Sequence, residues 1–305
     1  RFFAGQRPTT LLLGEIRERT LLLLGEIRER RGELPQGAAR YHEVIALPNV
    51  KPDMVWEAHA ALARLYARDH RPAEAESEYR KAFALMETSL ARLLEVEHQL
   101  PFFSSLDRFY DDYVDFLVGQ GRTAEALRVA DESRARLLHV RLQGTGSVPG
   151  HQIDYPRLAR DSKALLLFYS TAADRSFLWA VSADGIRLIP LPGEKTLSAL
   201  VSSYQQRILN SRDPLAEAAP EGAELYRLLV QPVATAMASA ERVILVSDGP
   251  LNPLNFETLI VPGPRSHYLI EDATLARTPS LRLLQVENAS PPARARSLLV
   301  FGDPV

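Results

Sequence analysis

The pattern of apolar positions changes once along the chain. Through residues 1–142, apolar side chains recur every three or four positions among Leu, Ala, Arg and Glu, which is the spacing of amphipathic helices. From about Asp161, short runs typical of β-strands replace this pattern, at 164–169, 177–181, 243–246 and 298–301. Helical stretches near 194–210 and 221–240 lie between the runs. The pattern predicts a helical domain followed by an α/β domain.

A stretch with the composition of a linker lies between the two parts. It begins Gln-Gly-Thr-Gly-Ser-Val-Pro-Gly, and glycine, serine and proline disfavour both helix and strand there. We therefore predict a helical repeat domain over 1–142, a linker over 143–152 and an α/β domain over 153–305.

The helical part contains a repeat. Counted from Trp56 as the first position, apolar and small residues fall where a tetratricopeptide repeat places them: Leu62, Ala63, Tyr66, Ala75, Tyr79 and Ala82. Small residues there let two antiparallel helices approach, and large ones fill the space between units. An earlier unit is visible around Leu24-Gly25 and 37–41. An ordinary helical bundle is the alternative interpretation.

A further unit follows the same pattern less closely. Its matching positions are Tyr113, Leu117, Ala126 and Ala130, and its turn, 121–126, resembles the turn at 70–75. This unit begins later than the repeat length of about 34 residues requires. We expect an extended helix near 82–99 to take up the difference.

The sequence LLLGEIRER occurs at 11–19 and again at 22–30. The shift is close to three helical turns, so on one continuous helix both copies would present the same face. Gly14 and Gly25 disfavour a single long helix, because each costs about 1 kcal/mol in a helix interior. A local duplication or a second short helix explains the pattern as well, and we attach no function to it.

Composition and charge indicate a soluble globular protein. Hydrophobic residues make up 46% and charged residues 24%, and the formal net charge is −2. Such a balance gives no electrostatic reason to expect nucleic acid or an anionic membrane as a partner. No apolar run reaches the roughly 20 residues of a membrane span, and no secretion signal is recognisable. We expect a cytoplasmic location.

The residues supply no complete catalytic set. The sequence has no cysteine, which excludes disulfides, thiolate metal sites and a cysteine nucleophile from these residues. None of the histidines shows a metal-ligand spacing: His42, His59, His70, His98, His139, His151 and His267. Phosphate-binding loops and a nucleophile elbow are also absent from the sequence. We predict no catalytic, cofactor-binding or metal-binding residue in this chain, and no cofactor.

Three stretches of the second half form a recognisable series. Residues 243–259, VILVSDGPLNPLNFETL, combine an apolar strand, a D-G-P turn and an N-F-E segment. Residues 268–272 read YLIED and are followed by Thr278-Pro279-Ser280-Leu281. Residues 298–304 end an apolar run in G-D-P. In order and spacing the series resembles the CHAT domain, a caspase-like, separase-related family whose members commonly carry tetratricopeptide repeats in front. Asn255 departs from the family's usual proline.

The resemblance implies the first portion of a caspase-like α/β sandwich, namely a pseudo-protease-like subdomain and the first strand of the active half. It also implies a cysteine peptidase whose catalytic histidine and cysteine lie downstream of the G-D-P strand. No cysteine is present, and no histidine follows His267. We therefore expect that the polypeptide continues, or that a second polypeptide completes the sheet.

The D-G-P turn has a structural interpretation. Gly249 suits positive φ and Pro250 fixes φ, while the apolar residues that follow can cover a sheet face: Leu251, Leu254, Phe256 and Leu259. We expect Asp248 to cap or brace the turn through backbone hydrogen bonds.

Two functions follow as hypotheses. The first is the N-terminal part of a caspase-like cysteine peptidase that cleaves a protein substrate, with the repeats binding substrate, activator or partner. The alternative is a non-catalytic adaptor with a degenerate caspase-like module. In both, the expected partner is a protein or peptide held in the groove of the repeats.

Overall fold

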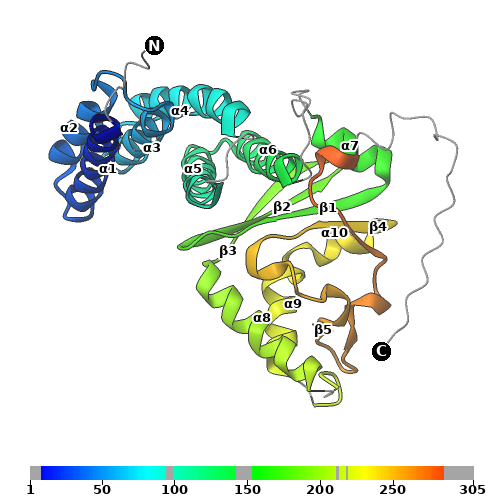
Figure 1. Ribbon diagram of the computed structural model, residues 1–305. Helices are drawn as coiled ribbons and strands as arrows, with labels where there is room; N and C mark the ends of the chain where they lie inside the picture. Colours follow the sequence, from blue (N-terminus) through cyan, green and yellow to red (C-terminus); the bar gives the residue numbers. More distant parts are fainter. Residues whose placement is uncertain (1–7, 94–98, 142–152, 211–212, 218, 285–305) are drawn as a thin grey trace, which may run out of the picture. The chain divides into compact units, whose positions relative to one another are not determined.

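A computed structural model of the protein describes residues 8–93, 99–141, 153–210, 213–217 and 219–284 (Figure 1). By contacts the chain divides into two compact units, Arg1–Arg122 and Thr123–Val305. The first is helical and the second contains a mixed sheet with helices, which confirms the predicted α and α/β classes. The predicted linker, 143–152, lies outside the described residues, so its place stays a prediction.

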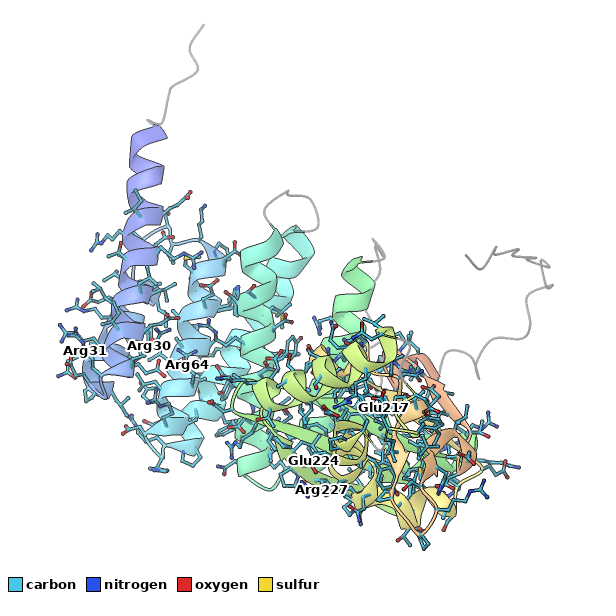
Figure 2. All side chains as sticks on the ribbon, turned by 90° about the horizontal axis from the view of Figure 1, so that it is seen from below. Arg30, Arg31, Arg64, Glu217, Glu224 and Arg227 are labelled. Atoms are coloured by element: carbon cyan, nitrogen blue, oxygen red, sulfur yellow. The ribbon has the colours of Figure 1, made fainter. Side chains whose placement is uncertain are left out.

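Helices that lie side by side build the first unit (Figures 1 and 2). They are α1 (Pro8–Arg30), α2 (Leu34–Ile45), α3 (Pro52–Arg68), α4 (Pro72–Leu93) and α5 (Gln99–Gly119). Pro52 and Pro72 each stand at the first helical position, where a missing N–H costs nothing. The extended helix expected near 82–99 is present as α4 up to Leu93, and residues 94–98 lie outside the described residues.

The chain leaves three helices of this unit through the same turn. Gly32, His70 and Gly121 have φ values of 76°, 57° and 72°. After each of them, an N–H donates to the carbonyl five residues back, at 2.9 Å, in the pairs Glu33 to Arg28, Arg71 to Tyr66 and Arg122 to Leu117. This is the left-handed turn that commonly ends helices. The similarity between 70–75 and 121–126 in sequence therefore reflects one turn geometry.

The positions of the repeat counted from Trp56 are buried. Relative exposure is at most 8% for all of them: Trp56, Leu62, Ala63, Tyr66, Ala75, Tyr79 and Ala82. Aromatic rings continue this core into α5, since Tyr79 stacks on Tyr113 at 4.6 Å and Trp56 meets Phe109 edge-on at 6.0 Å. The predicted small and large positions thus form the contacts between helices, while the assignment to the tetratricopeptide class stays a prediction.

The duplicated sequence forms one continuous helix, so the expectation that its glycines disfavour a single helix is wrong. Both copies present the same face, as the shift predicts, because Glu18 and Glu29 are buried while Ile16 and Ile27 are exposed. At Gly25 a side chain would put Cβ 2.4 Å from a ring carbon of Tyr41. The glycine permits close packing on α2, and this tertiary contact offsets its poor helix propensity.

The second unit is a mixed sheet between helices (Figure 1). Its helices are α6 (Thr123–Arg141), α7 (Tyr155–Ser162), α8 (Glu194–Leu209), α9 (Pro220–Leu229) and α10 (Ala234–Ala238). The sheet has the order β3-β2-β1-β4-β7, with strands Gly185–Pro192, Arg175–Ser182, Ala164–Ser170, Arg242–Val246 and Leu275–Arg277. β1, β4 and β7 run parallel, and β2 and β3 pair antiparallel. A small ribbon pairs β5 (Ile260–Val261) with β6 (His267–Tyr268).

The strands at 164–169, 177–181 and 243–246 are confirmed, and the run at 298–301 lies outside the described residues. The pattern missed β3 and β7. β3 contains Pro190 and Pro192, which fit an edge strand better than a central one, and β7 is short. The predicted helix at 221–240 is interrupted near Pro232, which cannot donate a helical hydrogen bond.

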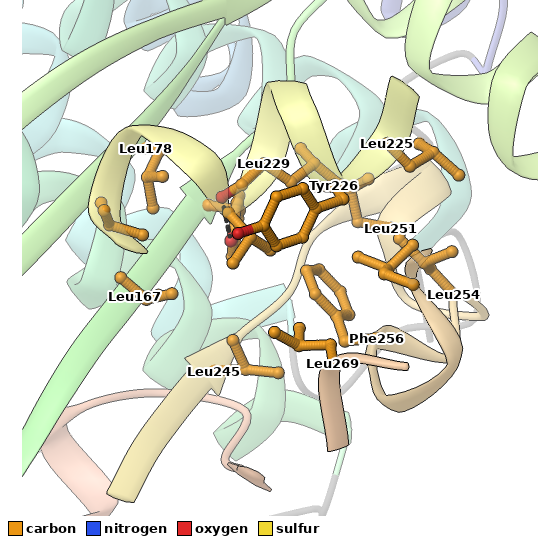
Figure 3. Packing of buried hydrophobic residues seen from close by; sticks show 14 of the residues in the cluster. Leu167, Leu178, Leu225, Tyr226, Leu229, Leu245, Leu251, Leu254, Phe256 and Leu269 are labelled. Carbon is orange, nitrogen blue, oxygen red and sulfur yellow. Dashed lines mark hydrogen bonds between the residues drawn. The ribbon is translucent and has the colours of Figure 1, made fainter. Parts of the chain in front are cut away.

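One face of the sheet packs against α8 and α9 (Figure 3). The strands contribute alternate residues to this core: Leu165, Leu167, Tyr169, Leu178, Ala180, Val243 and Leu245. The segment after β4 closes it from the side, because Leu251, Leu254, Phe256 and Leu259 are fully buried, as the sequence predicts. Tyr169 ties the core to α9 through a hydrogen bond from its hydroxyl to the carbonyl of Leu229 at 2.9 Å.

The opposite face of the sheet is equally apolar and is covered by α6 and α7. Leu166, Phe168 and Trp179 are fully buried there. The indole N–H of Trp179 donates to the carbonyl of Thr123, the first residue of α6, at 3.1 Å. The contacts of α6 therefore place it in the sheet unit.

Two alanine substitutions in the duplicated sequence test the packing of α1. Gly14 has open space around it, so Gly14→Ala should raise the free energy of unfolding by up to about 1 kcal/mol through helix propensity. Gly25→Ala should lower it by about 1–3 kcal/mol, because the new Cβ overlaps the ring of Tyr41. Urea unfolding followed by circular dichroism measures both, and changes of the same sign would contradict this packing.

Candidate binding groove and motif turns

The first unit has a cavity of about 80 Å³ between α1, α2, α3 and α5. Its walls combine aromatic, small and charged residues: Arg19, Leu22, Leu23, Glu26, Tyr41, Trp56, Glu57, Ala60, Ala61, Arg64, Ser105, Arg108, Phe109 and Asp112. Residues of α1, α2, α3 and α5 thus contribute to one concave site, which we call the groove. Its volume suits a small side chain rather than a cofactor.

Ion pairs form the rim of the groove. Arg19 on α1 pairs with Glu57 on α3 at 3.1 Å, and Arg108 on α5 pairs with Glu26 on α1 at 3.3 Å. The two arginine side chains are 51% and 60% exposed, so solvent screens these pairs and a ligand can exchange for either partner. The arginines of the rim are therefore the groups that a ligand can reach most readily.

A buried carboxylate connects the helices behind the groove. Glu29 on α1, 4% exposed, accepts hydrogen bonds from Arg64 at 2.9 Å, from Arg68 at 2.8 Å and from the Tyr41 hydroxyl at 3.1 Å. Burial by itself would raise the pKa of Glu29, but the hydrogen bonds from Arg64 and Arg68 hold it below its ordinary value. Because α1, α2 and α3 all contribute, Glu29 fixes the walls of the groove relative to one another.

Two carboxyl groups inside the groove have the opposite shift. Burial raises the pKa of Glu57, and the charge of Arg19 partly offsets it. Burial also raises the pKa of Asp112. The guanidinium group of Arg64, 3.4 Å from this carboxylate, partly offsets the increase. These shifts come from loss of hydration beside arginine partners, which is the environment of a binding surface as readily as of a catalytic one.

Three histidine side chains contact polar groups of neighbouring elements or turns. His42 contacts the Tyr66 hydroxyl at 3.1 Å, His59 contacts Glu78 at 2.5 Å and His267 contacts Asp272 at 2.9 Å. His98 and His151 lie outside the described residues. Over the part of the chain that the structure describes, no group of three or more His, Asp or Glu side chains is arranged to hold a metal ion. In the same part, no helix has the length and apolarity needed to cross a bilayer.

The D-G-P turn of the second unit has the predicted backbone but a different brace. Gly249 has φ of 46°, and a Cβ there would lie 2.5 Å from the hydroxyl of Thr171. The carboxylate of Asp248 makes no capping bond to its own turn. It accepts instead from the N–H of Thr171, at 2.7 Å, and pairs with Arg134 of α6. Asp248 thus braces the turn through a backbone hydrogen bond, as predicted, but the N–H belongs to the end of β1 and not to the turn. β1 and β4 are parallel neighbours, so their carboxyl ends meet.

The Thr-Pro-Ser-Leu stretch also binds α6. Asp131 of α6 is fully buried, and one of its oxygens accepts from the Ser280 hydroxyl at 2.7 Å and from the Leu281 N–H at 2.8 Å. Its other oxygen accepts from the Tyr155 hydroxyl at 3.2 Å. Burial raises the pKa of Asp131, and the hydrogen bond from Ser280 partly offsets this.

Sequence reasoning identified the motif turns but not their partners. Asp131 and Arg134 lie on an amphipathic helix, where charged residues are ordinarily solvated. Asp131 and Arg134 stand on either side of Ser133, and the sequence around them does not indicate that they are buried. Their burial results from contacts between elements that are distant in sequence, and the spacing of apolar residues does not reveal such contacts.

A scan of the chain against protein-family models matches residues 219–305 to the CHAT domain. The matched region includes β4, the D-G-P turn and the Thr-Pro-Ser-Leu stretch. A search of curated proteins found no match to the chain.

The Glu29 network gives a stability that depends on pH. Glu29→Gln should lower the free energy of unfolding at pH 7 by about 2–3 kcal/mol, because charge-assisted bonds to two arginines are lost. A lowered pKa means that the carboxylate stabilises the fold above its ordinary pKa of 4.5 and that this contribution disappears as pH falls further. Urea unfolding from pH 7 to pH 3 should show that the difference in free energy of unfolding between the wild type and Glu29→Gln becomes smaller.

The matched control is Glu43→Gln, since Glu43 is 47% exposed and pairs with Arg40 on the surface. Its effect should stay within about 0.5 kcal/mol at every pH. A Glu29→Gln gap that is equally wide at pH 7 and pH 3 would rule out the proposed role of the charge.

Proposed function

We propose, on the premise that residues 219–305 of this chain belong to the CHAT-domain family, that the chain is the binding portion of a caspase-like protein. In this proposal the groove of the first unit holds a peptide segment of a protein partner. The observation that carries the proposal is the concave site itself, lined by residues of α1, α2, α3 and α5.

The chemistry of the groove suits a peptide. Trp56 and Phe109 form an apolar floor of the groove. The small side chains of Ala60 and Ala61 leave open the space of the cavity beside α3. A cavity of about 80 Å³ accommodates one side chain of the ligand. Arginines and carboxylates alternate on the rim and can pair with backbone amides and carbonyls of an extended segment, or with charges of either sign.

The second unit supports a structural role for the described motif residues. Asp248 joins the turn after β4 to Thr171 and Arg134, Gly249 lets that turn approach Thr171, and Ser280 binds Asp131 of α6. A non-catalytic adaptor is therefore the function that the described residues support best.

Blocking the groove should abolish peptide binding. Ala60→Arg places a long side chain across the cavity without touching the buried core, and Ala84→Arg makes the same change on an exposed position of α4. A display library of random 12-residue peptides is selected on the wild-type chain, and the enriched peptides are measured by fluorescence anisotropy. Ala60→Arg should weaken their binding by about tenfold or more, since that corresponds to 1.4 kcal/mol, while Ala84→Arg should bind like wild type.

Circular dichroism of both variants checks that they fold. If the selection enriches no peptide, or if the enriched peptides bind Ala60→Arg as tightly as wild type, the groove is not the binding site.

The match to the CHAT domain favours a second candidate, a caspase-like cysteine peptidase. Such an enzyme attacks a peptide carbonyl with a thiolate that histidine activates. The 305 residues contain no cysteine, so in this proposal the nucleophile comes from outside them.

Sequencing the reading frame beyond Val305 tests this candidate. The peptidase hypothesis predicts a strand ending in His-Gly and a later strand ending in cysteine, and loss of substrate cleavage when that cysteine is changed to alanine. A stop codon after Val305, or cleavage that survives the change, would overturn it.

A further inference from the structure

The outer face of α1 is an exposed apolar stripe. Ile16, Leu23, Leu24 and Ile27 are 59%, 51%, 40% and 46% exposed. With Thr20 they follow the three- and four-residue spacing of one helix face, opposite the face that carries the buried Glu18, Leu22, Gly25 and Glu29. We call these five residues the outer face. Leu23 stands at its border with the groove, and the other four do not line the cavity.

Arginines border the outer face. Arg17, Arg30 and Arg31 are exposed, and Figure 2 shows Arg30 and Arg31 together at the end of α1. Their guanidinium groups have no ion pair with any carboxylate of the described residues. The border of the outer face is therefore positively charged.

The acidic residues of α1 are engaged elsewhere. Glu15 pairs with Lys51 at 2.6 Å and Glu26 pairs with Arg108 at 3.3 Å. Glu18 and Glu29 lie on the opposite, buried face. The arginines beside the outer face are therefore available to carboxylates of a partner.

We propose that the outer face docks an acidic amphipathic helix of a partner protein. Helices already lie side by side in this unit, and a stripe one helix wide accepts another helix by the same packing. Carboxylates flanking the apolar side chains of that helix would meet Arg17, Arg30 and Arg31, and this charge complementarity would set its orientation.

Two other occupants fit less well. A second copy of the chain would present another α1, whose carboxylates are already paired or buried, so arginines would face no free acid. An anionic bilayer favours an amphipathic helix whose opposite face is rich in lysine and arginine. The opposite face of α1 is buried and carries Glu18 and Glu29.

The test uses two designed helical peptides of 21 residues with leucine at every core heptad position. One has glutamate at the flanking positions and the other has lysine there. Fluorescence anisotropy should show that the chain binds the glutamate peptide and not the lysine peptide. The variant Leu24→Ser/Ile27→Ser should weaken binding by about tenfold or more, because two apolar contacts are lost. Leu209→Ser, at a residue 75% exposed on α8, is the control and should not change it.

A charge swap separates docking from a general effect on folding. Arg30→Glu/Arg31→Glu should reverse the preference, so that the lysine peptide binds and the glutamate peptide does not. Equal binding of both peptides by the wild-type chain, or an unchanged preference in the swap variant, would overturn the proposal. So would self-association in light scattering, or binding to phosphatidylserine vesicles, that Leu24→Ser/Ile27→Ser removes. The Ala60→Arg variant should keep the peptide bound, which distinguishes this surface from the groove.

Discussion

Burial of β1 on both of its faces is the constraint on which the second unit depends. Every residue of the strand from Ala164 to Ser170 is buried, so the sheet must have a layer of helices on each side. α8 and α9 supply one layer. The other layer comes from α7 together with α6, which precedes the CHAT match in the chain. The sheet unit is thus larger than the region that matches the CHAT domain, because α6 binds Trp179 on the apolar face that α7 also covers.

Two carboxylates fix α6 in that position. Asp131 on the helix binds Ser280 and the Leu281 N–H, while Asp248 on the turn after β4 binds Arg134 of the helix and Thr171 at the end of β1. Each carboxylate is buried and each has several donors, so removal of either would leave polar groups without partners. The two stretches that resemble the CHAT domain in sequence therefore serve in this unit to attach one helix. The described contacts of both stretches join secondary-structure elements of this unit.

The sequence predicted what depends on local pattern. The three main strands, the buried positions around Trp56, the apolar cover from Leu251 to Leu259 and the positive φ of Gly249 are all confirmed. The sequence did not predict the features that depend on contacts between residues far apart in the chain. Gly25 lies inside a continuous helix because Tyr41 packs on it, and Asp248 braces β1 because parallel strands bring Thr171 beside it. The groove was expected from the repeats, but its rim of Arg19, Glu57 and Arg108 combines three helices that no periodicity brings together.

α6 belongs structurally to the sheet unit. Native-state hydrogen exchange of the whole chain measures this, because amides that belong to one cooperative unit open with the same free energy and the same dependence on denaturant. The account predicts that amides of residues 127–135 in α6 open together with those of β1 and β4. If they open instead with the amides of α3 and α4, at a different free energy from β1, the claim is wrong.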